Sequence, residues 1–202
     1  MKYILFKIIA TFFAMVIFTN VSFAKTQVEQ SVPEQTDYPF SCSIGYGVML
    51  ITGDDSDGGD LYGPSVGIKY RVYTPSDFWF NIGCGFSYYS KTVDEVKMQF
   101  HAFDLLAEAE CFLWDSFVVS AGLMLKNYTN GKATYDGESI DLLSGDDKYY
   151  NKTNFGLTSS LSYNIDRFSV GFKIYVGLSN FGYETVDPLR VSTYTFFVGC
   201  YF

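Results

Sequence analysis

His101 is the one histidine of the 202-residue chain, and it is the side chain best suited to general acid–base chemistry near neutral pH. A single histidine can act as a general base only beside a positioned partner, such as a nucleophilic hydroxyl or an acid. The two residues that follow it are Ala102 and Phe103, neither of which supplies such a group. The sequence therefore favours a protein that is not an enzyme.

Seven charged residues form a second group that could do chemistry. Each alternates with apolar residues in a pattern of period two, so all seven are predicted to lie on one face of a sheet. A tight turn at 114–116 that pairs Leu113 with Phe117 would set Asp104 directly opposite Lys126. We interpret the group as an ion-pair network on the inner face of a sheet, because buried charges have to be paired. A polar gate or ion path is the alternative. The members are Lys69, Arg71, Asp104, Glu108, Glu110, Lys126 and Lys173.

Two further patterns could hold a ligand or a covalent link. The acidic segment with Asp54, Asp55, Asp57 and Asp60 lacks a glutamate at the twelfth position of a calcium loop, so we interpret it as a solvated loop. Weak binding of a divalent cation is the alternative. The four cysteines, Cys42, Cys84, Cys111 and Cys200, lack metal-ligand spacing and fit the role of small hydrophobic residues. A disulfide between Cys42 and Cys200 stays open, and neither a metal nor a cofactor is expected.

The first residues have the organisation of an export signal. Lys2 and Lys7 precede the apolar run Ile8 to Phe18, and Ser22-Phe23-Ala24 fits a cleavage site. We predict a signal peptide at 1–24, a periplasmic linker at 25–38 and one domain at 39–202. Cleavage would leave 12 basic residues against 22 acidic ones, a balance that disfavours nucleic acid as a partner.

The predicted domain alternates apolar and polar residues in eight stretches. After the signal peptide the chain has no run of 18 apolar residues, so a transmembrane helix is excluded and a closed barrel is the remaining way to cross a membrane. The polar positions are mostly Gly, Ser and Thr, as in a narrow barrel interior, whereas a soluble barrel would expose many charges. We predict an all-β fold, an eight-stranded antiparallel up-and-down transmembrane β-barrel. The stretches are Phe40 to Val48, Tyr62 to Tyr73, Phe78 to Tyr89, Phe103 to Cys111, Phe117 to Lys126, Thr153 to Tyr163, Phe168 to Leu178 and Tyr194 to Phe202.

The connections and the aromatic residues predict an orientation. Tight turns at 74–77, 114–116 and 164–167 alternate with longer segments at 53–61, 90–99, 127–152 and 179–190, which we expect to be extracellular loops. Aromatic residues gather at the predicted strand ends, where they would form two girdles at the membrane interfaces. The predicted outer girdle contains Tyr62, Tyr88, Phe100, Tyr128 and Phe155, and the inner one Phe78, Trp114, Phe117, Tyr163, Phe168 and Phe202.

The last strand carries a resemblance to a known family. It ends in Phe202, with Tyr194, Phe196, Val198 and Cys200 at alternate positions before it, and it resembles the terminal strand of outer-membrane barrels. In that family the segment is read by the barrel assembly machinery, although Cys200 stands where an aromatic residue is more usual. With the export signal and the strand count, the chain resembles the OmpA/OmpX-type superfamily of small barrels. The resemblance implies location in the bacterial outer membrane and contact with lipid and lipopolysaccharide.

The expected function is that of a non-enzymatic structural or adhesive surface protein that binds host or surface proteins through its loops. The segment Asn127 to Lys152 is the favoured contact, because it holds Tyr128, Tyr135, Tyr149 and Tyr150. A narrow transporter of small hydrophobic compounds is the first alternative. A lipid A-modifying enzyme is the second; the motif of such barrels resembles His-x-Ser, and here Phe103 replaces the serine.

Overall fold

The computed structural model describes residues 38–53, 59–72, 78–113, 116–145, 148–183 and 188–202. The predicted signal peptide and all but the last residue of the predicted linker lie outside these ranges. No helix in the described part of the chain is long and apolar enough to cross a membrane. The strands are β1 (Phe40–Thr52), β2 (Asp60–Val72), β3 (Phe78–Val93), β4 (Val96–Phe112), β5 (Phe117–Tyr135), β6 (Glu138–Asp141), β7 (Thr153–Ile165), β8 (Phe168–Gly177) and β9 (Arg190–Tyr201).

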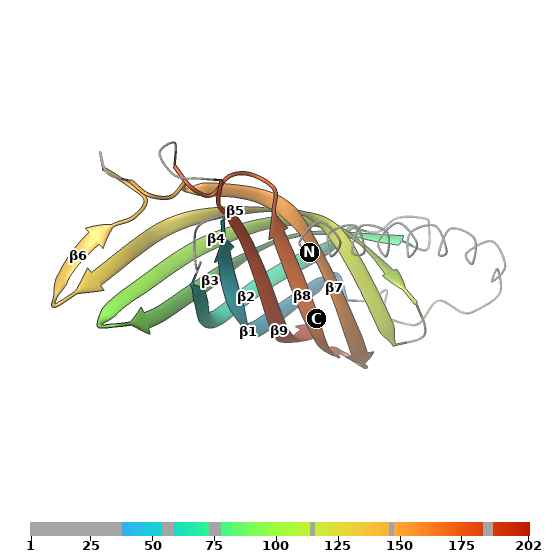
Figure 1. Ribbon diagram of the computed structural model, residues 1–202. Coiled ribbons are helices and arrows are strands. Elements are labelled where there is room, and N and C mark those ends of the chain that lie inside the picture. Colours follow the sequence, from blue (N-terminus) through green and yellow to red (C-terminus); the bar gives the residue numbers. More distant parts are fainter. Residues whose placement is uncertain (1–37, 54–58, 73–77, 114–115, 146–147, 184–187) are drawn as a thin grey trace, which may run out of the picture. The chain divides into compact units, whose positions relative to one another are not determined.

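Eight of these strands close into a barrel. Each pairs antiparallel with its neighbours in the order β4-β3-β2-β1-β9-β8-β7-β5, and an additional β4–β5 pairing completes the ring. The first and last strands meet from Ser41 opposite Tyr201 to Thr52 opposite Arg190. The predicted eight-stranded antiparallel barrel is therefore confirmed (Figure 1).

Three strands continue past the barrel and form a sheet with β6. Two tight hairpin turns, at Asp94-Glu95 and Asp136-Gly137, form the tips of this sheet. All four turn residues have positive φ. The extended outer ends project at the left of Figure 1. We call this part the protruding sheet; it consists of 90–93 of β3, 96–99 of β4, 130–135 of β5 and all of β6. The prediction of loops at 90–99 and 127–152 is wrong for 90–99 and for the part up to Asp141, which form strands joined by tight turns. Strands beyond the hydrocarbon need no apolar outer face, so the alternation that identified the other strands does not reveal them.

The outer surface of the barrel is apolar. Outward side chains such as Ile44, Ile82 and Phe196 are 63%, 53% and 57% exposed. In the described barrel strands, charged residues reach outward positions only at the outer ends, with Asp60, Lys97, Lys132 and Arg190. Each charge at the middle of a bilayer on this face would cost about 2 to 4 kcal/mol, so the pattern fits a surface in contact with lipid.

The interior is polar at its inner end and mainly apolar at its outer end. One buried apolar cluster includes Met49, Leu61, Leu106 and Met124 from four different strands, and it reaches inward past Asp104 and Lys126. Phe100 and Tyr128 also belong to it, at 0% and 1% exposure, so their prediction as girdle residues is wrong. Both residues point inward, as Asp104 and Lys126 do on the same two strands. The pairing of β4 with β5 shifts register between His101 and Ala102.

Gly63 marks a close approach of two strands and gives a test of the fold. A Cβ atom at this position would lie 1.9 Å from the Tyr88 carbonyl oxygen, whereas at Gly67, also inward on β2, it would meet only ordinary contacts beginning at 3.4 Å. We expect Gly63→Ala to lower the free energy of unfolding by roughly 1 to 3 kcal/mol, as overpacking does, and Gly67→Ala to change it little. Urea titration of the folded protein, followed by gel migration without boiling, measures both. Equal stability of the two variants would contradict this packing.

Candidate functional site

The inner end of the barrel interior is built around Arg71. Its Nη2 lies 2.5 Å from Glu110 Oε1, and Asn81 Nδ2 donates to Glu110 Oε2 at 2.6 Å. The guanidinium also lies over the rings of Trp79 and Tyr201, 5.1 Å from each centroid. This arrangement fills the base of the barrel with a paired, stacked cation.

A second ion pair joins strands that are not neighbours. Lys69 of β2 reaches across β3 to bind Glu108 of β4. The intervening residue on β3 is Gly83, where a Cβ would lie 3.1 Å from Lys69 Cγ. The missing side chain at Gly83 thus leaves room for the lysine to cross the interior.

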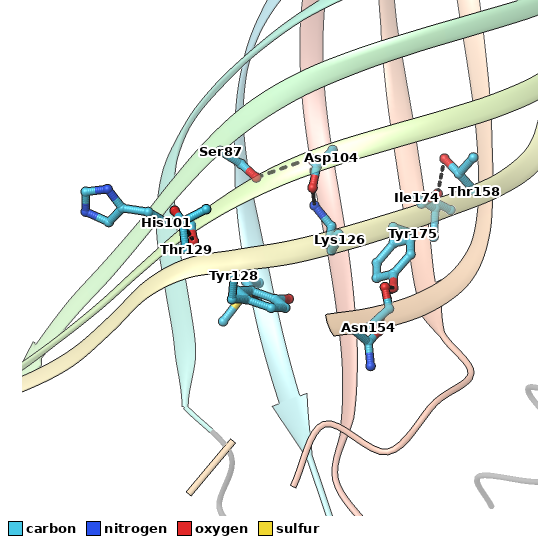
Figure 2. A network of polar contacts seen from close by, with 11 residues as sticks. Ser87, His101, Asp104, Lys126, Tyr128, Thr129, Asn154, Thr158, Ile174 and Tyr175 are labelled. Carbon is cyan, nitrogen blue, oxygen red and sulfur yellow. Dashed lines mark hydrogen bonds and ion pairs between the residues drawn. The ribbon is translucent and has the colours of Figure 1, made fainter. Parts of the chain in front are cut away.

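The third pair lies nearer the outer half. Lys126 Nζ donates to both carboxylate oxygens of Asp104, each at 2.9 Å, and Ser87 Oγ donates to Oδ2 at 3.3 Å. The two residues are direct cross-strand partners on β4 and β5. Lys126 Nζ lies 5.3 Å from the centroid of the Tyr175 ring. Figure 2 shows the hydroxyl of that ring directed toward Asn154, to whose Oδ1 it donates at 2.5 Å.

The seven interior charges sought in the sequence are thus brought together as three pairs and one remaining cation. Lys173 lies inside the barrel, between Ser160 of β7 and Thr195 of β9. Among the described carboxylates, none lies within ion-pair distance of its ammonium group. Asn81, Trp79 and Tyr201 also belong to the site, although a search for charged residues could not find them.

An aromatic plug closes the outer mouth of the interior. The rings of Phe100, Tyr128, Tyr150 and Phe181 pack together with centroid separations from 4.8 to 5.9 Å. Backbone hydrogen bonds hold the two contributing loops against each other, from Asn151 N to the Phe181 carbonyl at 2.7 Å among others. Tyr128 and Tyr150 are therefore packed inside, and only Tyr135 and Tyr149 of the four proposed contact tyrosines are exposed.

The outer rim carries an exposed ion pair. Asp60 accepts hydrogen bonds from Lys91, at 2.5 Å, and from Tyr62, and these lower the pKa of its carboxyl to about 2. The other three aspartates of the acidic loop, Asp54, Asp55 and Asp57, lie outside the described residues. In the part of the chain that the structure describes, no group of three or more His, Cys, Asp or Glu side chains could hold a metal ion.

His101 and the cysteines lie on the outward face. The His101 ring packs edge-on against Phe86 and Tyr88, with centroids 5.9 and 5.0 Å apart, and Figure 2 shows it directed away from the Asp104–Lys126 pair. Cys42 and Cys200 are direct partners across the β1–β9 seam, and both thiols are free.

The residues predicted as an assembly signal lie along β9, except Phe202, which directly follows it. Tyr194, Phe196, Val198 and Cys200 alternate with the inward residues Thr193, Thr195 and Phe197, and β9 is paired on both sides, by β1 and by β8. Their part in assembly stays a prediction.

The barrel is similar to solved structures of two bacterial proteins. Ail, the attachment invasion locus protein of Yersinia pestis, is 16% identical with a TM-score of 0.55, over 81% of this chain and 97% of that chain. Ail in complex with the heparin analogue sucrose octasulfate is 14% identical with a TM-score of 0.54, and the match covers the same shares of both chains. Neisserial surface protein A gives 16% and 0.54, again over 81% and 97%. No protein-family model and no curated protein matches the sequence. The predicted small outer-membrane barrel type is confirmed at the level of fold.

The Asp104–Lys126 pair gives a test of the interior. Lys126→Met leaves a buried carboxylate without its cation, so we expect a loss of roughly 3 to 5 kcal/mol in the free energy of unfolding. The double variant D104L/K126M removes both charges and should recover most of that loss. Denaturant titration compares the three proteins. A double variant no more stable than the single one would show that the charge pairing is not what matters at this position.

The rim pair gives a prediction about pH. Because its pKa is lower when folded than the ordinary 3.8, Asp60 stabilises the fold above that value, and this contribution disappears as the pH falls toward 2. Lys91→Met removes the largest cause, so the carboxyl midpoint should rise toward 3.8 while the Tyr62 hydrogen bond keeps it somewhat below. Carbon-detected NMR titration of the Asp60 side chain measures the midpoint. An unchanged midpoint in K91M would rule out the lysine as its cause.

Proposed function

We propose that this protein is a non-enzymatic surface protein of the bacterial outer membrane that binds extracellular partners through the protruding sheet. The observation that carries the proposal is an exposed apolar face on that sheet. Val93, Tyr135 and Ile140 have the inward parity of the barrel strands, yet they lie beyond the barrel and are 49%, 56% and 59% exposed. Apolar side chains gathered on one face above the membrane are a common mark of a protein-binding surface.

The free edge of β6 adds a second means of binding. Within the described chain β6 pairs on one side only, with β5, so its other backbone N–H and C=O groups are open to a further strand. Such an edge can add an extended peptide by main-chain hydrogen bonds while adjacent side chains supply specificity. Ile140, one of the residues of the apolar face, lies on this edge strand.

Charge indicates the chemistry of the partner. The hairpin tips carry Asp94, Glu95, Asp136 and Glu138, and 13 of the 22 acidic residues fall in the four outer segments. A polysulfated ligand such as the heparin analogue bound by Ail would be repelled by these groups. An extended segment of a host or bacterial surface protein that combines apolar and basic side chains fits better.

Lipopolysaccharide and the assembly machinery complete the proposed partners. Lys97, Lys132 and Arg190 lie outward at the outer ends of their strands, where they could meet lipopolysaccharide phosphates. We also propose that the barrel assembly machinery recognises the terminal strand. This proposal rests only on the alternating apolar residues of that strand. Divalent bridging at the acidic loop is the least supported of these contacts, because Asp60 is already paired with Lys91.

The two alternatives have less support. A narrow transporter would carry its solute through lateral gaps between strands, and each of the eight barrel strands is paired with both of its neighbours around the ring. A lipid A-modifying enzyme would need a nucleophile and an acid around His101, whose described ring contacts are Phe86 and Tyr88.

Adhesion tests the proposal. In a non-adherent Gram-negative host that produces the protein, we expect binding to epithelial cell layers above that of the empty host. The double variant Tyr135→Lys/Ile140→Lys places two charges on the apolar face and should reduce the bound cells at least several-fold. Counting bound bacteria per host cell measures the effect, with surface amounts matched by antibody.

The matched control adds the same charges on the other face. Thr134 and Ser139 are direct partners on β5 and β6 whose hydroxyls lie 2.9 Å apart. Thr134→Lys/Ser139→Lys should leave adhesion near that of the parent protein. Equal adhesion of parent, first variant and empty host would refute the proposal, and an equal loss in both variants would assign the effect to charge instead of the apolar face.

A further inference from the structure

The interior of the barrel contains two small cavities. Their volumes are about 40 and 20 Å³, and Ser43, Lys69, Lys173 and Phe197 line both. The larger holds roughly three water-sized groups, which is too little for an organic ligand. It lies between the aromatic plug and the Arg71–Glu110 base.

The charges around the larger cavity do not balance. Lys69, Lys126 and Lys173 line it, and Asp104 is the one carboxylate among the described lining residues. Asp104 already accepts two hydrogen bonds from Lys126 and one from Ser87. Lys69 is bound to Glu108, which lines neither cavity. One ammonium group, that of Lys173, has no described carboxylate within ion-pair distance, although Glu108 and Asp104 act on it from farther away.

An unpaired buried ammonium is costly, so it either loses its proton or finds an anion. The cavity offers what an anion requires besides positive charge. Hydroxyl groups of Ser43, Ser65, Thr193 and Thr195 line the same wall, and each can donate one hydrogen bond. The larger cavity thus combines three ammonium groups, one carboxylate that is already hydrogen-bonded, and a set of hydroxyl donors.

We propose that this cavity binds a small monovalent inorganic anion of the size of chloride, held by Lys173 with Lys69 and the surrounding hydroxyls. The site is independent of the protruding sheet. The bound anion acts as a part of the interior and completes its charge balance.

Unfolding in different salts tests the site. The protein is folded in a zwitterionic detergent with sodium chloride or, at equal ionic strength, sodium gluconate, whose anion exceeds the cavity. Chloride should raise the unfolding temperature of the parent protein with saturation. Lys173→Met removes the unpaired charge, so its unfolding temperature should be the same in both salts and above that of the parent in gluconate. Lys132→Met, at an exposed outward position, should respond to chloride as the parent does.

A direct observation keeps the test decisive if K173M fails to fold. Crystals of the parent protein grown in sodium bromide should show an anomalous peak inside the barrel beside Lys173. No peak at that place, no difference between chloride and gluconate, or a chloride response that survives in K173M would each overturn the proposal.

Discussion

Closure of the sheet is the constraint on which the other features depend. In hydrocarbon every backbone N–H and C=O must be paired within the protein, so the first and last barrel strands have to meet. The β1–β9 pairing accomplishes this over twelve residue pairs. Once the ring is closed, alternate side chains can point only to lipid or to a narrow centre. The outer surface is therefore apolar, and the inner surface carries the polar and charged side chains.

The narrow centre explains the interior chemistry. With no room for bulk water, each charge needs a partner, and the pairs at Glu108, Glu110 and Asp104 join strands across the barrel as well as along it. The outer half is filled with aromatic and aliphatic side chains, which close the mouth. We therefore propose that partners contact the strands of the protruding sheet, which carry the exposed apolar face.

Period two predicted the eight barrel strands because contact with lipid imposes it, and the turn after Leu113 was enough to set Asp104 opposite Lys126. The protruding sheet was missed because its strands have no lipid to face; Asp136-Gly137 was the local pattern that could have indicated a hairpin. The aromatic plug could not be predicted from the sequence, because Phe181 and Tyr150 come from two loops that are distant in the chain and meet only in the folded barrel. No local pattern encodes such a meeting.

Contact with lipid can be measured without altering the protein. Leu105 and Leu106 are neighbours on β4, the first 47% exposed on the outer surface and the second 9% exposed inside. In nanodiscs, NMR should detect nuclear Overhauser effects from lipid acyl-chain protons to the methyl groups of Leu105 and of Ile44 and Ile82, and none to Leu106 or Leu61. The reverse pattern, with the inner methyl groups in contact with lipid, would contradict the account.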